Sequence, residues 1–186
     1  MNEPFAYCPR CGRPLIDRTR QGRGTRRECA APSCGFVQRT NPVPCVGALV
    51  EHEGEMILAR NVGWPDGWFA LIAGYLEARE DPRTAVRREV KEELDLDVVE
   101  THPIGNYIFE RKNEVMLCYH AVATGTIRLG AELSEYRRYQ RHELRPWPRA
   151  SGLAVADWMT ARGLPFEFED FPGAASWLEK ADTSES

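Results

Sequence analysis

The feature that most constrains this chain is one acidic and arginine-rich stretch, GYLEAREDPRTAVRREVKEELDL, which runs from position 74 to position 96. Asp81 is followed by Pro82 within it. An aspartate side chain accepts hydrogen bonds from the free N–H groups at a helix start, and proline fits the first helical position. The stretch therefore predicts a helix that begins near residue 81.

Three glutamates share one face of this expected helix. Glu89, Glu92 and Glu93 are spaced at i, i+3 and i+4, which places their side chains side by side. Taken alone, the segment EVKEEL is typical of a solvated acidic surface. Three close carboxylates repel one another, however, and a hard divalent cation such as Mg²⁺ or Mn²⁺ removes that repulsion. The spacing of the whole stretch favours this second interpretation.

The stretch resembles the box of a known family. Its defined positions are Gly74, Glu80, Arg88-Glu89-Val90, Glu92-Glu93, Asp95 and Leu96. They match the Nudix box, G-x5-E-x7-R-E-U-x-E-E-x-G-U with U aliphatic, at eight of nine positions. The exception is Asp95, where the family has glycine. Aspartate tolerates the left-handed conformation that ends such a helix, so we expect the turn to be kept.

This resemblance implies a fold and an activity. The fold is an α/β/α sandwich with a mixed sheet, and the activity is metal-dependent hydrolysis of nucleoside diphosphates linked to another moiety. The metal would be Mg²⁺ or Mn²⁺. The implied ligands are Glu89, Glu92 and Glu93, the carbonyl of Gly74, and Glu80 in an outer shell or at a second metal. Arg88 would pair with a box glutamate and hold it in place.

The general base and the substrate-binding residues do not follow from the box. Glu135, with Glu132 second, is the candidate base, because relatives place a glutamate at this distance after the box, here in an expected acidic loop. Trp64 and Trp68 lie in a turn-rich loop before the box, where a ring can stack on a flat base. Burial of Trp68 beneath the sheet is the simpler alternative. Tyr107, in an expected strand, is a further candidate.

Two cysteine pairs near the N-terminus predict a second metal site. Cys8 and Cys11 are separated by two residues, and Cys29 and Cys34 by four. Four thiolates in such knuckles form a closed tetrahedral site for a structural Zn²⁺. Two disulfides are the alternative, which a cytoplasmic location disfavours. Residues 1–40 contain few apolar residues, so this segment is expected to need the metal in order to fold.

Together the CPxCG knuckle, Asn41-Pro42 and AGYLE resemble a zinc-ribbon branch of the Nudix superfamily. Its members include NADH pyrophosphatases and plant enzymes that cleave FAD and ADP-ribose, and zinc-ribbon relatives are often dimers. The SQPWPFP-type motif of the NADH pyrophosphatases is missing, and the nearest string is RPWP at 145–148. FAD or ADP-ribose is therefore expected at least as strongly as NADH.

Charge is distributed unevenly along the chain. Residues 1–40 hold eight arginines and three acidic residues, a net +5 within a chain of net −4. An alternative function is therefore an RNA-cap or nucleic-acid-associated protein that grips phosphates with the ribbon. The arginines concerned are Arg18, Arg20, Arg23, Arg26 and Arg27. A solvated, flexible loop between the knuckles is the simpler interpretation. A nucleotide sensor without turnover is a third hypothesis, which the intact acidic ligands disfavour.

Three parts are expected: a zinc ribbon over 1–40, a Nudix domain over 41–165, and a C-terminal helix with a disordered tail over 166–186. The expected strands are 45–51, 56–60, 69–74, 97–102, 104–110, 115–123 and 136–139, and the later helices are 149–163 and 173–181. No apolar run is long enough to span a bilayer and no signal-peptide pattern is present, so a cytoplasmic location is expected.

Four residues outside these motifs have simpler assignments. Cys45, Cys118 and His120 lie in apolar strands and are expected in the core. His52, in a turn, is expected to be solvated.

Overall fold

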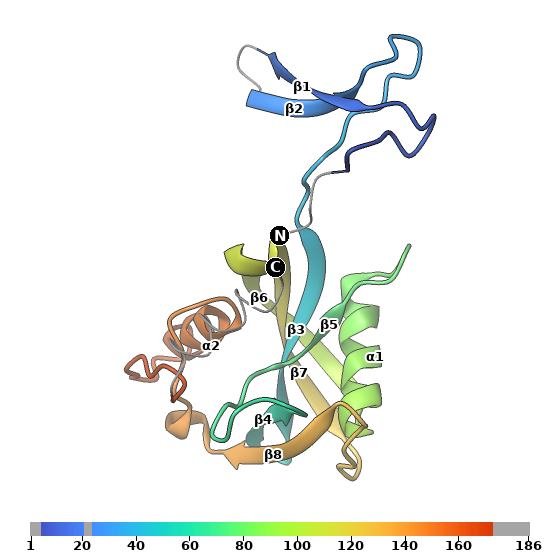
Figure 1. Cartoon of the computed structure of the whole chain (residues 1–186). Coiled ribbons are helices and arrows are strands. Elements are labelled where there is room, and N and C mark those ends of the chain that lie inside the picture. The colour runs from blue at the N-terminus through green and yellow to red at the C-terminus, as the bar shows by residue number, and fades with distance from the viewer. Residues whose placement is uncertain (1–4, 21–23, 173–186) are drawn as a thin grey trace. The chain divides into compact units, whose positions relative to one another are not determined.

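The computed structural model describes residues 5–20 and 24–172 (Figure 1). The chain divides into two compact units, one formed by residues 1–42 with 111–113 and the other by 43–110 with 114–186. The helix expected over 173–181 and the tail lie outside the described residues. In the described part, no helix is both long enough and apolar enough to cross a bilayer.

The first unit contains a two-stranded antiparallel sheet, formed by β1 (Leu15–Arg20) and β2 (Gly24–Cys29). The expectation of a flexible loop between the knuckles is therefore wrong for these residues. The small core of the unit consists of Cys8, Leu15 and Cys29, with Phe36 packed against it. Such a core is too small to stabilise the unit alone.

The second unit is built on a six-stranded sheet in the order β6-β7-β3-β4-β8, with β5 paired to β3. The sheet is mixed, because β3 runs parallel to β7 and antiparallel to β4 and β5. The strands are β3 (Val43–His52), β4 (Glu55–Asn61), β5 (Ile72–Tyr75), β6 (Asp97–Phe109), β7 (Glu114–Thr124) and β8 (Leu133–Tyr139).

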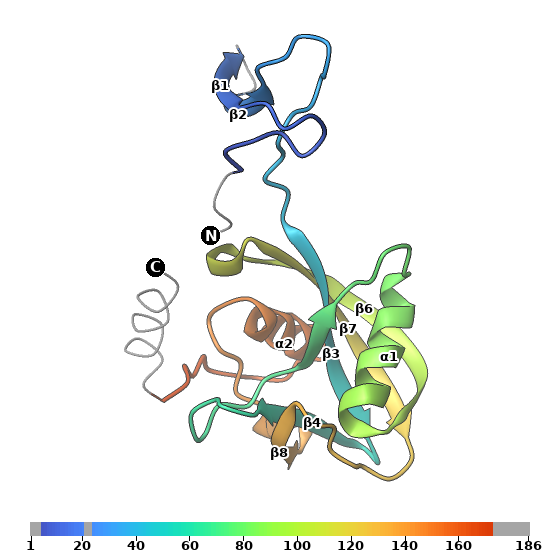
Figure 2. The ribbon, with the colours of Figure 1, turned by 45° about the vertical axis from the view of Figure 1, so that its right-hand side comes forward.

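Two helices cover opposite faces of this sheet (Figure 2). The helix α1 (Pro82–Leu94) packs Val86 and Val90 into one apolar core. The helix α2 (Ser151–Thr160) packs Trp158 into a second core on the other face. The predicted α/β/α sandwich is confirmed.

Local signals define both ends of α1 as predicted. The Asp81 side chain accepts a hydrogen bond from the Arg83 N–H, with Pro82 in the first turn. At the other end, Asp95 has a φ of 57° and donates its N–H to the Lys91 carbonyl. The Lys91 ammonium lies 2.9 Å from the Asp95 carboxylate. Aspartate therefore replaces glycine in the left-handed cap and gains an ion pair there.

The strands expected over 97–102 and 104–110 form one strand, β6, whose register shifts between Pro103 and Gly105. Proline has no N–H to donate, but β6 is an edge strand, and on an edge that donor is not needed. The proline therefore marks an irregularity within one strand and not the gap that was expected between two.

His52 is buried, so the prediction that it is solvated is wrong. Its Nε2 lies 3.0 Å from the Gly125 carbonyl, and its Nδ1 lies 3.1 Å from the Arg138 guanidinium. Both partners come from distant parts of the sequence, which a local turn pattern does not reveal. Cys45 and Cys118 are buried, as predicted.

His120 is a buried histidine, as predicted, and its Nε2 lies 2.9 Å from Glu51 Oε2. Burial lowers its pKa, against the opposing effect of Glu51. The folded state therefore binds fewer protons than the unfolded state, whose histidine has a pKa of about 6.5, and stability falls as the pH drops below that value. We expect His120→Gln to flatten this loss in urea unfolding between about pH 7 and 5. The exposed His142→Gln serves as the control, because His142 is not among the groups that shift the His120 pKa. An unchanged pH dependence in His120→Gln contradicts the assignment.

Candidate active site

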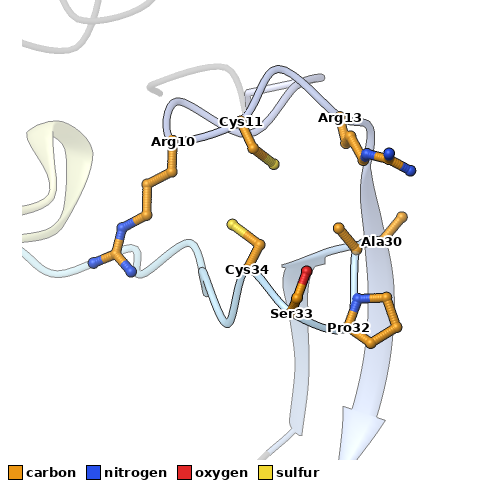
Figure 3. A pocket seen from close by; sticks show the side chains of 8 residues that line it. Arg10, Cys11, Arg13, Ala30, Pro32, Ser33 and Cys34 are labelled. Carbon is orange, nitrogen blue, oxygen red and sulfur yellow. The ribbon is translucent and has the colours of Figure 1, made fainter.

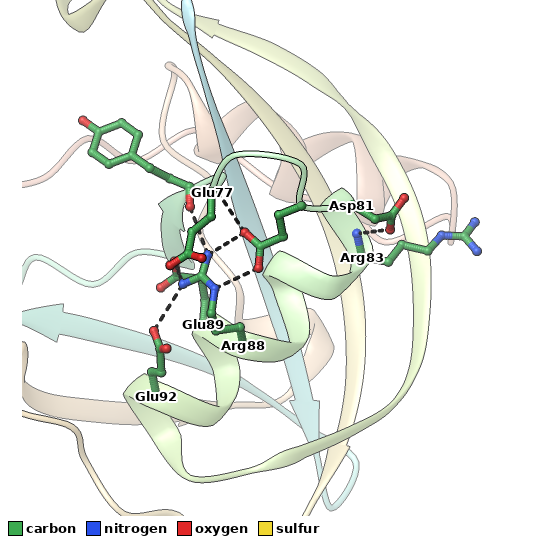
Figure 4. A network of polar contacts seen from close by, with 8 residues as sticks. Glu77, Asp81, Arg83, Arg88, Glu89 and Glu92 are labelled. Carbon is green, nitrogen blue, oxygen red and sulfur yellow. Dashed lines mark hydrogen bonds and ion pairs between the residues drawn. The ribbon is translucent and has the colours of Figure 1, made fainter.

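The Arg88 guanidinium contacts three carboxylates of the box, those of Glu80, Glu89 and Glu92 (Figure 4). Its Nε and Nη2 each lie 2.9 Å from one oxygen of Glu80, and its Nη1 lies 2.6 Å from Glu89 Oε1 and 3.2 Å from Glu92 Oε2. Its Nη2 also donates to the Tyr75 carbonyl at 3.0 Å. Five contacts from one planar guanidinium fix its orientation and hold the strand β5 and the helix α1 together.

Glu80 forms a two-point ion pair with Arg88. Both of its oxygens accept from Arg88, and one also accepts from the Glu77 N–H. These hydrogen bonds lower the pKa of Glu80 to about 2, with Arg88 as the larger cause. They also raise the pKa of Arg88. Glu80 is thus ionised, and both of its oxygens already accept hydrogen bonds. This suits a residue that holds Arg88 in place from outside the first ligand shell of a metal.

The three helix glutamates differ in exposure. Glu89 and Glu93 are buried, whereas 58% of the Glu92 side chain is exposed. Burial raises the pKa of Glu93 to about 8, and the negative charges of Glu89, Glu132 and Glu92 add to the effect. Within the described residues, no group donates a hydrogen bond to the Glu93 carboxylate. Ionisation of Glu93 is therefore unfavourable unless a cation neutralises the charges around it.

Gly74 leaves room for one of these carboxylates. A β-carbon built on Gly74 overlaps the carboxylate of Glu89. The box glycine is therefore required by the close approach of β5 to the Glu89 side chain, whatever its backbone angles.

We expect Gly74→Ala to displace the Glu89 carboxylate and to reduce turnover about 100-fold, since a misplacement of about 1 Å at a reacting centre has that order of effect. Ala73→Ser, at the exposed neighbouring position of the same strand, adds one atom away from the site and should leave turnover unchanged. Steady-state kinetics of both variants decide the matter. A fully active Gly74→Ala contradicts this role for the contact.

A loop after β7 approaches the same helix end. The Arg128 N–H donates to the Leu94 carbonyl and the Gly130 N–H to the Glu93 carbonyl, both at 2.9 Å. A β-carbon on Gly130 overlaps the Glu92 carbonyl oxygen. This close packing brings Glu132 near enough to raise the pKa of both Glu89 and Glu93.

Glu135, the first candidate for the general base, is not in a loop as expected. It lies in β8 and pairs with Arg60 and Arg137, each at 3.3 Å. Two ion pairs hold the Glu135 carboxylate beside β4. The charge that raises the pKa of Glu89 and Glu93 is instead that of Glu132, the second candidate. The sequence offered both residues at similar distances from the box and gave no signal that separates them.

The three predicted substrate-binding aromatic residues have different environments. Trp68 is only 5% exposed, stacks on Phe171 with ring centroids 4.9 Å apart, and donates its Nε1–H to the Pro172 carbonyl. Its rings are therefore part of the core and not placed to stack on a ligand. The Tyr107 hydroxyl donates to Asp157 of α2 at 2.6 Å. Trp64 is partly buried against the core and stays a candidate.

The four cysteines of the first unit converge as predicted. Their sulfur atoms all lie within 4.8 Å of one another, and none of the six cysteines forms a disulfide. The Cys8–Cys34 and Cys11–Cys29 sulfur separations are 3.6 and 3.5 Å. A tetrahedral site with Zn–S bonds of about 2.3 Å needs sulfurs about 3.8 Å apart, so the cluster fits Zn²⁺. Figure 3 shows Cys11 and Cys34 facing each other across a pocket.

The box glutamates also fit a divalent cation. Glu93 is a buried carboxylate without a donor, and Gly74 leaves the space that Glu89 occupies. Oxygen-only ligands with excess negative charge suit Mg²⁺ or Mn²⁺. The Arg88 contacts to Glu89 and Glu92 pre-position two of these carboxylates.

The fold and this cluster define a class of protein: an α/β/α domain with a carboxylate site on one helix beside a short strand. Residues 41–158 match the family described as NUDIX domain, and the chain belongs to the Nudix family. A crystal structure of a NUDIX hydrolase from Nitrosomonas europaea is similar, with a TM-score of 0.67 and 25% identity, over 89% of this chain and 97% of that one.

Two relatives are named NAD-capped RNA hydrolase NudC. The protein of Mycobacterium tuberculosis is 32% identical over 123 residues, which are 63% of this chain and 37% of the relative. That of Pseudomonas fluorescens is 28% identical over 171 residues, which are 90% of this chain and 60% of the relative. The chain thus covers 37% to 60% of the length of these relatives. These likenesses support the prediction of a Nudix pyrophosphohydrolase.

Proposed function

We propose that the Nudix unit hydrolyses the pyrophosphate bond of a dinucleotide of the NAD type, free or at the 5′ end of an RNA. The observation that carries this proposal is the carboxylate cluster around α1, in which Glu93 is buried without a donor. The names of the two NudC relatives support the choice of dinucleotide. FAD and ADP-ribose, which the missing SQPWPFP-type motif favoured as strongly, become alternative outcomes of the test.

The chemistry requires that negative charge be neutralised at the pyrophosphate, because that charge repels an attacking water. A divalent cation held by the box supplies this neutralisation when bound, and it lowers the pKa of bound water. The residues that would hold it are Glu89, Glu92 and Glu93 with the Gly74 carbonyl. Arg88 keeps Glu89 and Glu92 in place, and Glu80 keeps Arg88 in place.

The attacking water must lose a proton. We assign its acceptor to Glu132 in place of Glu135, because Glu132 lies within the electrostatic reach of Glu89 and Glu93, whereas Glu135 is held by two arginines. Water then adds across the P–O–P bond and yields two phosphate monoesters. A cytoplasmic location, a homodimer and base stacking by Trp64 stay predictions.

A substrate panel tests the proposal. NADH, NAD-capped RNA, FAD and ADP-ribose are incubated with Mg²⁺ or Mn²⁺, and products are separated by chromatography. We expect NADH and NAD-capped RNA to be cleaved into two monophosphates in each case. Cleavage of FAD or ADP-ribose alone contradicts the substrate assignment. No cleavage of any compound contradicts the hydrolase and favours a nucleotide sensor.

A further inference from the structure

The hairpin of the first unit has two unlike faces. Leu15 and Cys29 are paired across the strands and buried, and on the same face the Thr19 and Thr25 hydroxyls lie 2.8 Å apart. Because side chains alternate along a strand, the neighbouring pair, Arg18 opposite Arg26, points to the other face. This second face also carries Ile16 opposite the buried Glu28, and it is opposite to the face that packs Leu15 and Cys29 into the small core.

Two arginines directly opposite each other are unfavourable in an isolated hairpin. Both side chains are exposed, and half of Arg18 (52%) is accessible although it lies 3.7 Å from Glu28. Within the described residues, the Arg26 side chain has no hydrogen bond or ion pair. The hairpin sequence, LIDRTRQGRGTRREC, holds five arginines and two acidic residues. Such a concentration lowers the stability of a unit with little core, unless an anion binds there.

Exposed aromatic rings accompany these charges in the same unit. Phe5 is 60% exposed and Tyr7 is 65% exposed, directly before the first metal ligand. Arg10 and Arg13 flank the pocket at the cysteine knuckles (Figure 3). Surfaces that bind single-stranded nucleic acid combine aromatic faces that stack bases with arginines that contact phosphates, and the first unit exposes both kinds of side chain.

We propose that the first unit binds single-stranded RNA, through Arg18 and Arg26 and the exposed rings of Phe5 and Tyr7. The inference rests on the proposed function, because the RNA would be the body of a substrate whose 5′ end carries the dinucleotide. Residues 1–40 carry a net charge of +5, whereas the whole chain has −4. The phosphates are therefore attracted to the ribbon and repelled elsewhere.

The test measures RNA binding apart from hydrolysis. A fluorescein-labelled single-stranded RNA with a 5′ monophosphate is titrated with the full chain over a salt series, and anisotropy is recorded. We expect Arg18→Ser/Arg26→Ser to weaken binding about tenfold or more at low salt. The slope of log affinity against log salt should fall by about 1.4, since each phosphate contact on a single strand contributes about 0.7.

Three further variants sharpen this comparison. Arg83→Ser/Arg87→Ser removes the same charge from exposed positions of α1 and should bind RNA like the wild type. Arg18→Lys/Arg26→Lys should restore most of the binding, and Tyr7→Ala should weaken it without changing the salt slope. A zinc content of one ion per chain shows that the first unit is folded in each variant. All variants should cleave free NADH at the wild-type rate.

Either of two results overturns the inference. One is a wild-type chain that does not bind the RNA at low salt. The other is a zinc-loaded Arg18→Ser/Arg26→Ser variant with wild-type affinity and salt slope. Failure of the proposed function gives a different result, namely no cleavage of free NADH by the wild type while RNA binding is still measured.

Discussion

Glu93→Gln is expected to reduce turnover at least about 100-fold, the order of loss found when one preorganised electrostatic group is removed from an active site. Glutamine keeps the side-chain volume but cannot ionise, so it cannot supply the negative charge with which Glu93 would hold a cation at this buried position. Glu89→Gln should have a similar effect, and it replaces the charged acceptor of the Arg88 Nη1, 2.6 Å away, by a neutral one. Initial rates with NADH and Mg²⁺ measure both.

Glu100→Gln is the matched control, because Glu100 is exposed on β6 and pairs with His102. It should keep wild-type turnover. Thermal unfolding of the zinc-loaded chains without Mg²⁺ or Mn²⁺ should differ little between Glu93→Gln and the wild type, which separates loss of chemistry from loss of fold. Substantial turnover in a folded Glu93→Gln contradicts the assignment of the site to the box.

Removal of the structural metal is expected to unfold the first unit. In small zinc domains, metal binding supplies about 10 kcal/mol or more of the folding free energy, and this unit has only Cys8, Leu15 and Cys29 as a buried core. Cys8→Ser should abolish bound zinc, which should otherwise be one per chain. It should also make the hairpin over residues 15–29 sensitive to trypsin, which cleaves at its arginines.

Cys45→Ala serves as the control, since Cys45 lies in β3 and outside the cluster. It should keep the zinc and the trypsin resistance of the wild type. A zinc-free Cys8→Ser chain whose hairpin stays resistant contradicts the structural role of the metal.

Local signals predicted α1 and its caps well. Asp81 and Asp95 act through hydrogen bonds to neighbours in the sequence, and Pro82 acts through its fixed backbone angle, so all three can be predicted from the sequence of one helix. Contacts between distant segments were harder to predict. His52 was expected in solvent, because the sequence around it does not indicate that Gly125 and Arg138 are its partners. The arginine-rich hairpin was missed because its pairing follows from the cysteine cluster and not from an apolar pattern.

The same distinction applies to the site. The box identified Glu89, Glu92, Glu93 and Arg88 through their spacing on one helix. It did not separate Glu132 from Glu135, because the separation depends on where β8 begins and on the packing of Gly130 against α1. Trp68 and Trp64 also looked alike in sequence, and the contact of Trp68 with Phe171 and Pro172, about a hundred positions away, decides its burial.

In the proposed site, the glutamates of α1 hold the divalent cation used in cleavage. The most direct measurement is a Mn²⁺ titration of the full, zinc-loaded chain, followed by electron paramagnetic resonance, for the wild type, Glu93→Gln and Glu100→Gln. The wild type and Glu100→Gln should bind Mn²⁺ with the same affinity, and Glu93→Gln should bind it at least about tenfold more weakly. Equal affinity in all three chains would contradict the claim.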